Sequence, residues 1–63
     1  MKKYYHFETL FRSLKEGLTV FLKRNSIRYE VSSLYPAPGW HFEILCSPGD
    51  VTMINDWLDR QSI

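Results

Sequence analysis

The sequence predicts an α+β domain with the element order strand, helix, strand, strand, helix. Two observations carry this prediction. Residues 40–46 alternate between apolar and polar side chains, which is the period of a strand with one buried face. Residues 51–58 then repeat apolar side chains at helical spacing, directly after the helix-start signal Ser47–Asp50. A strand that runs straight into an amphipathic helix indicates a sheet with helices packed on it.

The chain has 63 residues, so we expect a single domain spanning residues 1–63. A chain of this size buries only about 60% of the surface that its unfolded form exposes, and a dimer would add burial. Cys46 is the only cysteine, which excludes an internal disulfide and a cysteine-rich zinc site. Aromatic residues make up 16% of the chain, and their bulk lets a few side chains fill a core.

Charge and hydropathy narrow the classes of partner. The formal net charge of +1 is too small to indicate nucleic acid or a membrane surface, so nucleic-acid binding is a minor hypothesis. No apolar run approaches the roughly 18 residues that a bilayer crossing needs. Residues Met1–His6 are basic, but no apolar stretch follows them, so we expect no signal peptide. A lone thiol fits a reducing compartment. We therefore expect a cytoplasmic protein with no membrane association.

The first two elements are a short aromatic strand and a long helix. Residues 3–7 favour a strand whose alternation places Tyr5 and Phe7 on its inner face. Residues 8–24 predict a helix with Thr9 as its N-cap and Asn25 as its left-handed end. Gly17 indicates close approach of this helix to the sheet, or else to a ligand or partner backbone. The apolar stripe of the helix consists of Leu10, Phe11, Leu14, Leu18, Phe21 and Leu22.

The remaining elements complete a three-stranded sheet. Residues 27–31 alternate as a second strand, and residues 32–39 form a connection because their two prolines cannot lie in a central ladder. Both helices have one apolar stripe, so the simplest packing places them on one face of the sheet. A right-handed crossover between the first two strands leaves room for the third between them. We therefore predict an antiparallel or mixed sheet of order 1-3-2, which corresponds to half of a ferredoxin-like sheet.

This order resembles two small bacterial βαββα families, one named for selenium or sulfur carriage and the other for prokaryotic signal transduction. The carrier-like family has a cysteine beside a glycine in the loop before the third strand. The corresponding loop here has Gly39 but no cysteine, so we carry over no functional residue. The resemblance rests on the strand Tyr4–Phe7, the step from Leu22 to Ile27, the strand Ile27–Val31, the proline-containing loop, the strand Phe42–Cys46 and the helix after Asp50.

Cys46 is the first candidate for chemistry. Its parity with Phe42 and Ile44 predicts that it faces the helices, and a buried cysteine usually acts as a small apolar side chain. The alternative is a reactive thiol, because Cys46 precedes the N-terminus of the last helix and a helix N-terminus stabilises a thiolate. Core packing is the favoured interpretation.

The outward face of the sheet is the second candidate. With strand order 1-3-2, we expect His6 and His41 to be neighbours, with Glu43 and Glu30 nearby. Imidazole and carboxylate groups together suit metal binding or acid–base chemistry, although the sequence leaves the metal open. The favoured alternative is an ordinary solvated face with cross-strand charge pairs, such as Arg28 with Glu43.

The third candidate is the loop segment Leu34, Tyr35 and Pro36. The favoured interpretation is a stiff connection that packs Tyr35 on the edge of its own fold, and the alternative is a partner-binding surface. We predict a non-enzymatic binding, interaction or regulatory module that has no cofactor. Its partner is another protein or a second copy, through the uncovered sheet face or an edge strand. The alternative function is a small sulfur-carrier-like or metal-binding protein that uses Cys46 or the face of His6 and His41.

Overall fold

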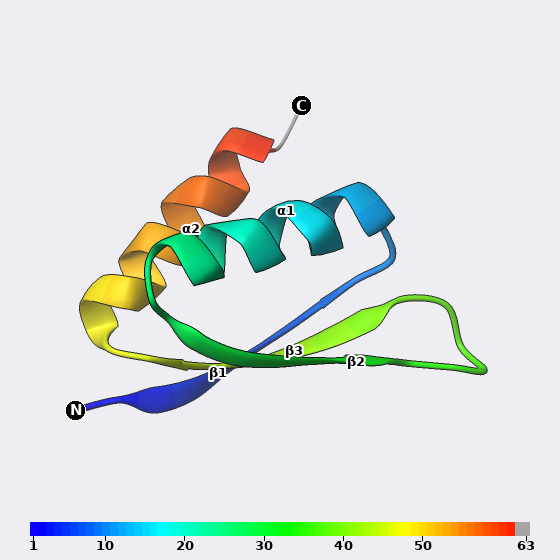
Figure 1. Ribbon diagram of the computed structural model, residues 1–63, viewed down its shortest axis with the longest axis horizontal. Helices are drawn as coiled ribbons and strands as arrows, with labels where there is room; N and C mark the ends of the chain where they lie inside the picture. The colour runs from blue at the N-terminus through cyan, green and yellow to red at the C-terminus, as the bar shows by residue number, and fades with distance from the viewer. Residues whose placement is uncertain (62–63) are drawn as a thin grey trace.

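The computed structural model describes residues 1–61, in which two helices pack on one face of a three-stranded antiparallel sheet (Figure 1). The strands lie in the order β1–β3–β2, and both outer strands pair antiparallel with β3. The predicted α+β class, the βαββα order and the strand order are confirmed. The elements are β1 (Lys3–Thr9), α1 (Arg12–Arg24), β2 (Arg28–Ser33), β3 (Trp40–Cys46) and α2 (Pro48–Gln61).

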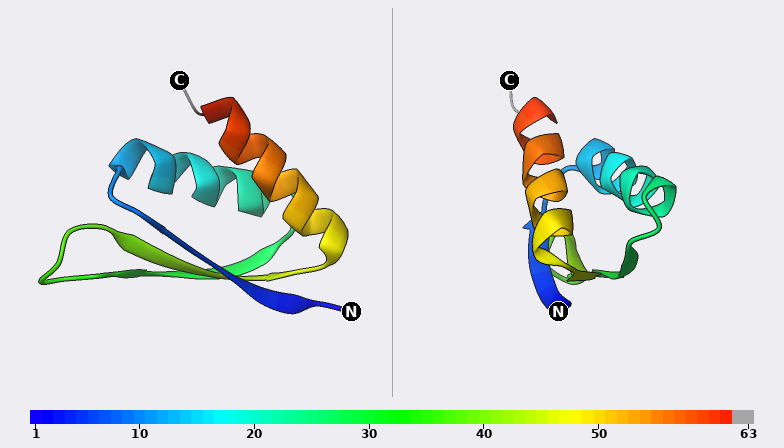
Figure 2. Two further views of the ribbon diagram at one scale, coloured as in Figure 1. Left: turned by 180° about the vertical axis from the view of Figure 1, so that it is seen from behind. Right: turned by 90° about the vertical axis from the view of Figure 1, so that its left-hand side faces the viewer.

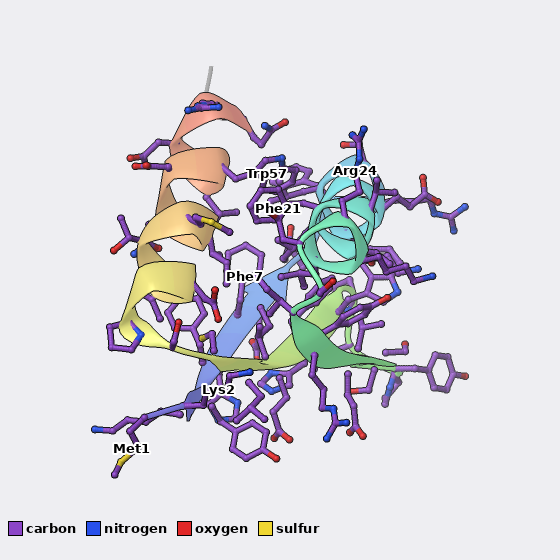
Figure 3. All side chains as sticks on the ribbon, turned by 60° about the vertical axis from the view of Figure 1, so that its left-hand side comes forward. Met1, Lys2, Phe7, Phe21, Arg24 and Trp57 are labelled. Carbon is purple, nitrogen blue, oxygen red and sulfur yellow. The ribbon has the colours of Figure 1, made fainter. Side chains whose placement is uncertain are left out.

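The core lies between the sheet and the two helices, and β3 supplies its centre. Phe42 is fully buried and lies opposite Phe7 of β1 and Val31 of β2 in the strand register. Figure 3 shows Phe7 pointing from the sheet into the space below the helices. The inward members of the alternation in β3 therefore form the floor of the core. The buried apolar side chains are Leu18, Leu22, Ile27, Phe42, Ile44, Cys46 and Ile54.

The first helix begins later than the sequence predicted, at Arg12 rather than at residue 8. Strand β1 continues to Thr9, which pairs with Trp40 in the sheet, so the predicted N-cap role of Thr9 is wrong. Its hydroxyl instead accepts a hydrogen bond from the Phe11 backbone N–H at 3.1 Å. Phe11 takes the N-cap position with extended dihedrals and without a side-chain cap. The cause is sheet pairing, which satisfies backbone groups that the predicted first helical turn would have left free.

The end of α1 also differs from the prediction. Asn25 has φ −101°, and Ser26 takes the left-handed conformation with φ 56°. The Asn25 side chain donates a hydrogen bond at 2.8 Å to the Phe21 carbonyl, which also accepts the Asn25 backbone N–H at 3.2 Å. The second strand begins at Arg28, one residue later than predicted, because Ile27 is buried and donates its N–H to the Leu22 carbonyl.

The two helices approach each other closely at Gly17. A Cβ atom at this position would lie 3.2 Å from Trp57 of α2, so the close neighbour is the second helix and not the predicted sheet. The Trp57 ring also stacks on Phe21, with ring centroids 5.4 Å apart. Figure 3 shows these two rings between the helices. The missing side chain of Gly17 thus makes room for the ring that joins α1 to α2.

The start of α2 matches the predicted capping signal. The Asp50 backbone N–H donates to the Ser47 hydroxyl at 3.2 Å, and the Ser47 N–H donates to the Asp50 carboxylate at 3.1 Å. This reciprocal pair is a capping box that satisfies two backbone donors at the turn between β3 and α2. It sets the angle at which α2 returns over the sheet, beside α1 (Figure 2).

Candidate functional site

One face of the sheet has neither helix over it in residues 1–61, as the end-on view of Figure 2 shows. The side chains on this face alternate with those of the core, and Figure 3 shows them below the sheet, away from the helices. The three members from the central strand are half-buried, and the six from the outer strands are exposed. We call this the polar sheet face; it consists of Tyr4, His6, Glu8, Arg28, Glu30, Ser32, His41, Glu43 and Leu45.

The strand register brings the predicted site residues of this face into two neighbouring rows. His6 of β1 lies opposite Glu43 of β3, and Glu43 lies opposite Glu30 of β2. His41 lies one row further along β3, opposite Glu8. The four residues are therefore neighbours as predicted, and the register adds Glu8. The predicted helix began at residue 8, which hid the outward strand position that this glutamate occupies.

Three of these side chains form a continuous chain of polar contacts. The Nδ1 atom of His6 lies 3.2 Å from Nε2 of His41. The Nδ1 atom of His41 lies 3.0 Å from a carboxylate oxygen of Glu8. The two imidazole rings are tilted by 36°, with centroids 5.3 Å apart, so they meet through their nitrogen edges and do not stack. The arrangement holds both rings by contacts within the chain.

The carboxylate at one end determines the protonation pattern of the neutral rings. A carboxylate only accepts hydrogen bonds, so Nδ1 of His41 must carry the proton that is donated to Glu8. Neutral His41 then has a lone pair on Nε2, and Nδ1 of His6 is the donor of the bond between the rings. Glu8 thereby presents the His41 lone pair toward His6.

The carboxylates of Glu43 and Glu30 are arranged differently. They lie directly opposite each other, and they line a shallow recess of about 370 Å³ together with Tyr4 and Arg28. The register places Arg28 opposite Leu45, and within residues 1–61 it makes no salt bridge with Glu43, so the predicted pair does not form. Like charges directly opposite each other on a sheet destabilise it. This row thus concentrates negative charge beside the two histidines.

The described chain gathers few metal ligands. Within residues 1–61, no group of three or more His, Cys, Asp or Glu side chains is placed to hold a metal ion. The facing nitrogens of His6 and His41 are two ligand atoms at the same point. Any further ligands at this point would have to come from solvent or from movement of a neighbouring carboxylate.

Cys46 lies apart from the polar sheet face, on the core side of β3. It is 2% exposed, and its thiol lies 3.7 Å from the Ile44 carbonyl, toward which it donates. Burial raises the pKa of the Cys46 thiol, and the nearby Asp50 carboxylate raises this pKa further. A reactive thiol needs a shift in the opposite direction. The carboxylate that caps α2 thus opposes the stabilisation that the helix N-terminus would offer a thiolate.

The predicted loop segment lies at one end of the molecule, beside the connection between β1 and α1 (Figure 1). Tyr35 is 87% exposed, so the favoured expectation that it packs on its own fold is wrong. Leu10 and Phe11 are 65% and 66% exposed, although the helical stripe had placed them in the core. Leu34 and Leu10 both lie against Gly39. We call the group of Leu10, Phe11, Leu34 and Tyr35 the apolar end.

Sequence reasoning missed two members of the apolar end. Leu10 and Phe11 fit the helical spacing of the residues that follow, so periodicity alone assigned them to the helix. The signal that would have found them is the alternation of inward residues in β1. After Tyr5 and Phe7 the next inward position is Thr9, which is buried, so the strand extends to this residue. Two residues directly after such a strand belong to a connection, and large apolar residues in a connection are candidates for an interaction surface.

Two hollows adjoin the apolar end. One has a volume of about 260 Å³ and is lined by Leu10, Leu34, and Glu8 and Thr9 at the end of β1. The other has a volume of about 420 Å³. It is lined by Phe11, by Leu14 of α1 and by Gln61 at the end of α2. The exposed ring of Phe11 thus borders one hollow, and Tyr35 follows Leu34, which lines the other.

No protein-family model, curated protein or solved structure matches this chain. These comparisons therefore give no support to the resemblance to small bacterial families. Neither helix within residues 1–61 has the length and apolar character needed to cross a membrane.

Proposed function

We propose that this chain is a non-enzymatic interaction module that pairs with a second copy of itself through the apolar end. The observation that carries the proposal is the exposure of Leu10, Phe11 and Tyr35 at one end, each by more than 60%. Leu10 and Leu34 both lie against Gly39, and exposed apolar surface of this kind marks a candidate interaction site. A domain of 63 residues also gains stability when association adds burial to its small core.

A second copy is the favoured occupant because the apolar end contains both protrusions and hollows. A two-fold dimer brings the same patch of both subunits together, so the patch must complement itself. Here the exposed ring of Tyr35 follows Leu34, which lines the hollow of about 260 Å³. Phe11 borders the larger hollow of about 420 Å³. A ring from one copy can enter a hollow of the other, and the reverse contact follows by symmetry.

The polar sheet face is a poorer docking surface for an apolar partner. Glu43 and Glu30 lie opposite each other without a partner of opposite charge in the same row. Covering them would remove water from two carboxylates, and the cost of burying an unpaired charge is large. The apolar end has one carboxylate at its border, Glu8, which lines the hollow of about 260 Å³ and contacts His41.

The non-enzymatic part of the proposal is supported by the position of Cys46, whose thiol is buried and has a raised pKa. A single free thiol is also consistent with a cytoplasmic location, which belongs to the same proposal.

Sedimentation equilibrium over the micromolar range tests this function. We expect a monomer–dimer equilibrium whose dissociation constant rises about tenfold or more in Tyr35→Ser, because a buried aromatic anchor contributes more than about 1.4 kcal/mol. Tyr4→Ser is the matched control, because Tyr4 is 62% exposed on the polar sheet face. An equal effect of both variants would move the interface away from the apolar end. A strictly monomeric chain at high micromolar concentration would overturn self-association and leave a different protein as the only remaining occupant.

A further inference from the structure

We propose that His6 and His41 form a seat for a first-row transition-metal dication of the class that imidazole binds, namely Zn²⁺, Ni²⁺ or Cu²⁺. This inference does not rest on the proposed self-association, because His6 and His41 lie on the polar sheet face. The two surfaces meet at Glu8, which contacts His41 and lines the hollow beside the apolar end. It starts from the 3.2 Å separation of Nδ1 of His6 and Nε2 of His41, which point toward each other across β1 and β3.

The distance between these nitrogens matches the geometry of a shared metal ligand pair. Two imidazole nitrogens that bind one ion at about 2.0–2.1 Å with tetrahedral angles lie about 3.3 Å apart. The rings of His6 and His41 already hold their nitrogens at nearly this separation. An ion can therefore replace the hydrogen bond between the rings with a small outward movement, and the strand register need not change.

Glu8 occupies the position of a supporting residue for such a site. A metal-binding histidine commonly donates its other ring N–H to a carboxylate, which fixes the ring and makes the binding nitrogen more basic. His41 has this arrangement, with its Nδ1 atom 3.0 Å from Glu8. The same contact leaves the lone pair of neutral His41 on Nε2, the atom that faces His6. Glu8 is thus a positioning residue and not a ligand.

The proton balance of metal binding is simple for this pair. In the metal-free chain, Nδ1 of neutral His6 carries the proton of the bond between the rings. To bind the ion, His6 takes the other tautomer, with the proton on the exposed Nε2 and a lone pair on Nδ1. The proton passes through solvent, and no net proton is released from the neutral pair.

The surroundings favour a cation and define its class. Glu43 lies directly opposite His6, and Glu30 lies opposite Glu43, so negative charge adjoins the seat and raises the local concentration of cations. Two nitrogen ligands select transition metals over Ca²⁺ and Mg²⁺, which prefer oxygen. Since residues 1–61 supply no third placed ligand, water completes the coordination and the site is open.

Titration of the untagged chain with Zn²⁺, and separately with Ni²⁺, tests the proposal by calorimetry and by NMR of the imidazole resonances. We expect saturable binding of one ion per chain with shifts at both His6 and His41. His6→Ala and His41→Ala should each weaken binding about tenfold or more, and Glu8→Gln should weaken it by about tenfold, the lower limit for loss of a supporting carboxylate. Glu16→Gln is the matched control, because this exposed glutamate lies on α1.

The result that would overturn the proposal is an absence of saturable binding, or binding that survives in the double variant of His6 and His41. A stoichiometry of half an ion per chain would also overturn it, because the ion would then bridge two copies. His6 is exposed, so its substitution does not threaten folding, and circular dichroism of His6→Ala verifies this.

Discussion

The polar sheet face and the apolar end differ in the contacts that their side chains make within the chain. On the polar sheet face, Glu8 contacts His41 and His41 contacts His6, and the strands that carry them set their spacing. At the apolar end, Phe11 and Tyr35 are exposed and lie in two different connections. The first surface is already organised and suits a small ion. The second gains only when another molecule covers it, so it suits a macromolecule.

The difference has a physical origin in the two kinds of interaction. Polar side chains on a sheet can satisfy each other only at separations that the register supplies, so their positions are precise. Apolar side chains gain free energy in proportion to the area that is removed from water, and this gain does not depend on direction. The polar sheet face therefore depends on geometry, whereas the apolar end depends on exposed area.

The largest expected effect separates the two surfaces directly. The double variant Phe11→Ser with Tyr35→Ser should raise the dimer dissociation constant by about a hundredfold, because two aromatic anchors are lost. Metal affinity should change much less than the dimer dissociation constant, since Phe11 and Tyr35 are not members of the metal seat and the two surfaces meet at the border residue Glu8. Sedimentation and calorimetry on the same samples measure both quantities. A parallel loss of metal affinity would show that the two surfaces are coupled.

The second prediction concerns Gly39, which lies under the apolar end. Gly39 has φ 111°, and a Cβ atom there would lie 2.8 Å from the Thr9 carbonyl oxygen. Gly39→Ala should therefore lower the free energy of unfolding by about 2 kcal/mol. Urea denaturation measures this change. Gly49→Ala is the control, because its Cβ atom would lie 3.9 Å from the Ser47 hydroxyl and its loss of stability should be negligible.

The third prediction concerns the pKa of the Cys46 thiol, which lies in the core and belongs to neither surface. Burial raises its pKa in the folded chain, with a further contribution from Asp50, so the unfolded chain loses the thiol proton first as the pH rises. The stability contributed by the neutral thiol is complete below about pH 9 and decreases above it, by up to about 1.4 kcal/mol per pH unit. Urea denaturation across this range should show a steeper decline than in Cys46→Ala. Equal slopes would contradict the raised pKa.

The smallest expected effect concerns charge on the polar sheet face. Glu30→Gln removes one of two like charges that lie opposite each other, so stability should rise by about a few tenths of a kcal/mol at low salt. Added salt should reduce this gain by screening. Thermal denaturation at two ionic strengths measures it, with Glu16→Gln as the control. A gain of the same size in both variants would reflect general charge and not the pair with Glu43.

Much of the fold followed from local patterns. The alternation in residues 40–46 and the capping box of Ser47 and Asp50 are short-range features, and both appear in the structure as predicted. The order of strands followed from the crossover between the first two strands, which leaves room for the third between them. The start of α1 did not follow, because Leu10 and Phe11 satisfy the helical period equally well. Their placement depends on the pairing of Thr9 with Trp40, which lies 31 positions further along the chain.

The sequence by itself determined the α+β class, the βαββα order, the inward alternation of β3 and the outward placement of His6 and His41 on neighbouring strands, because each depends on local periodicity and on chain topology. Only the tertiary structure decided that Glu8 joins this pair and that Glu43 meets Glu30 rather than Arg28. Arg28 and Glu30 both lie on the outward face of β2, so a shift of two residues in strand register would exchange them. The alternation of apolar and polar residues excludes a shift of one residue but leaves a shift of two open. The tertiary structure also decided that Leu10 and Phe11 leave the core, since sheet pairing and helix formation compete for the same backbone groups.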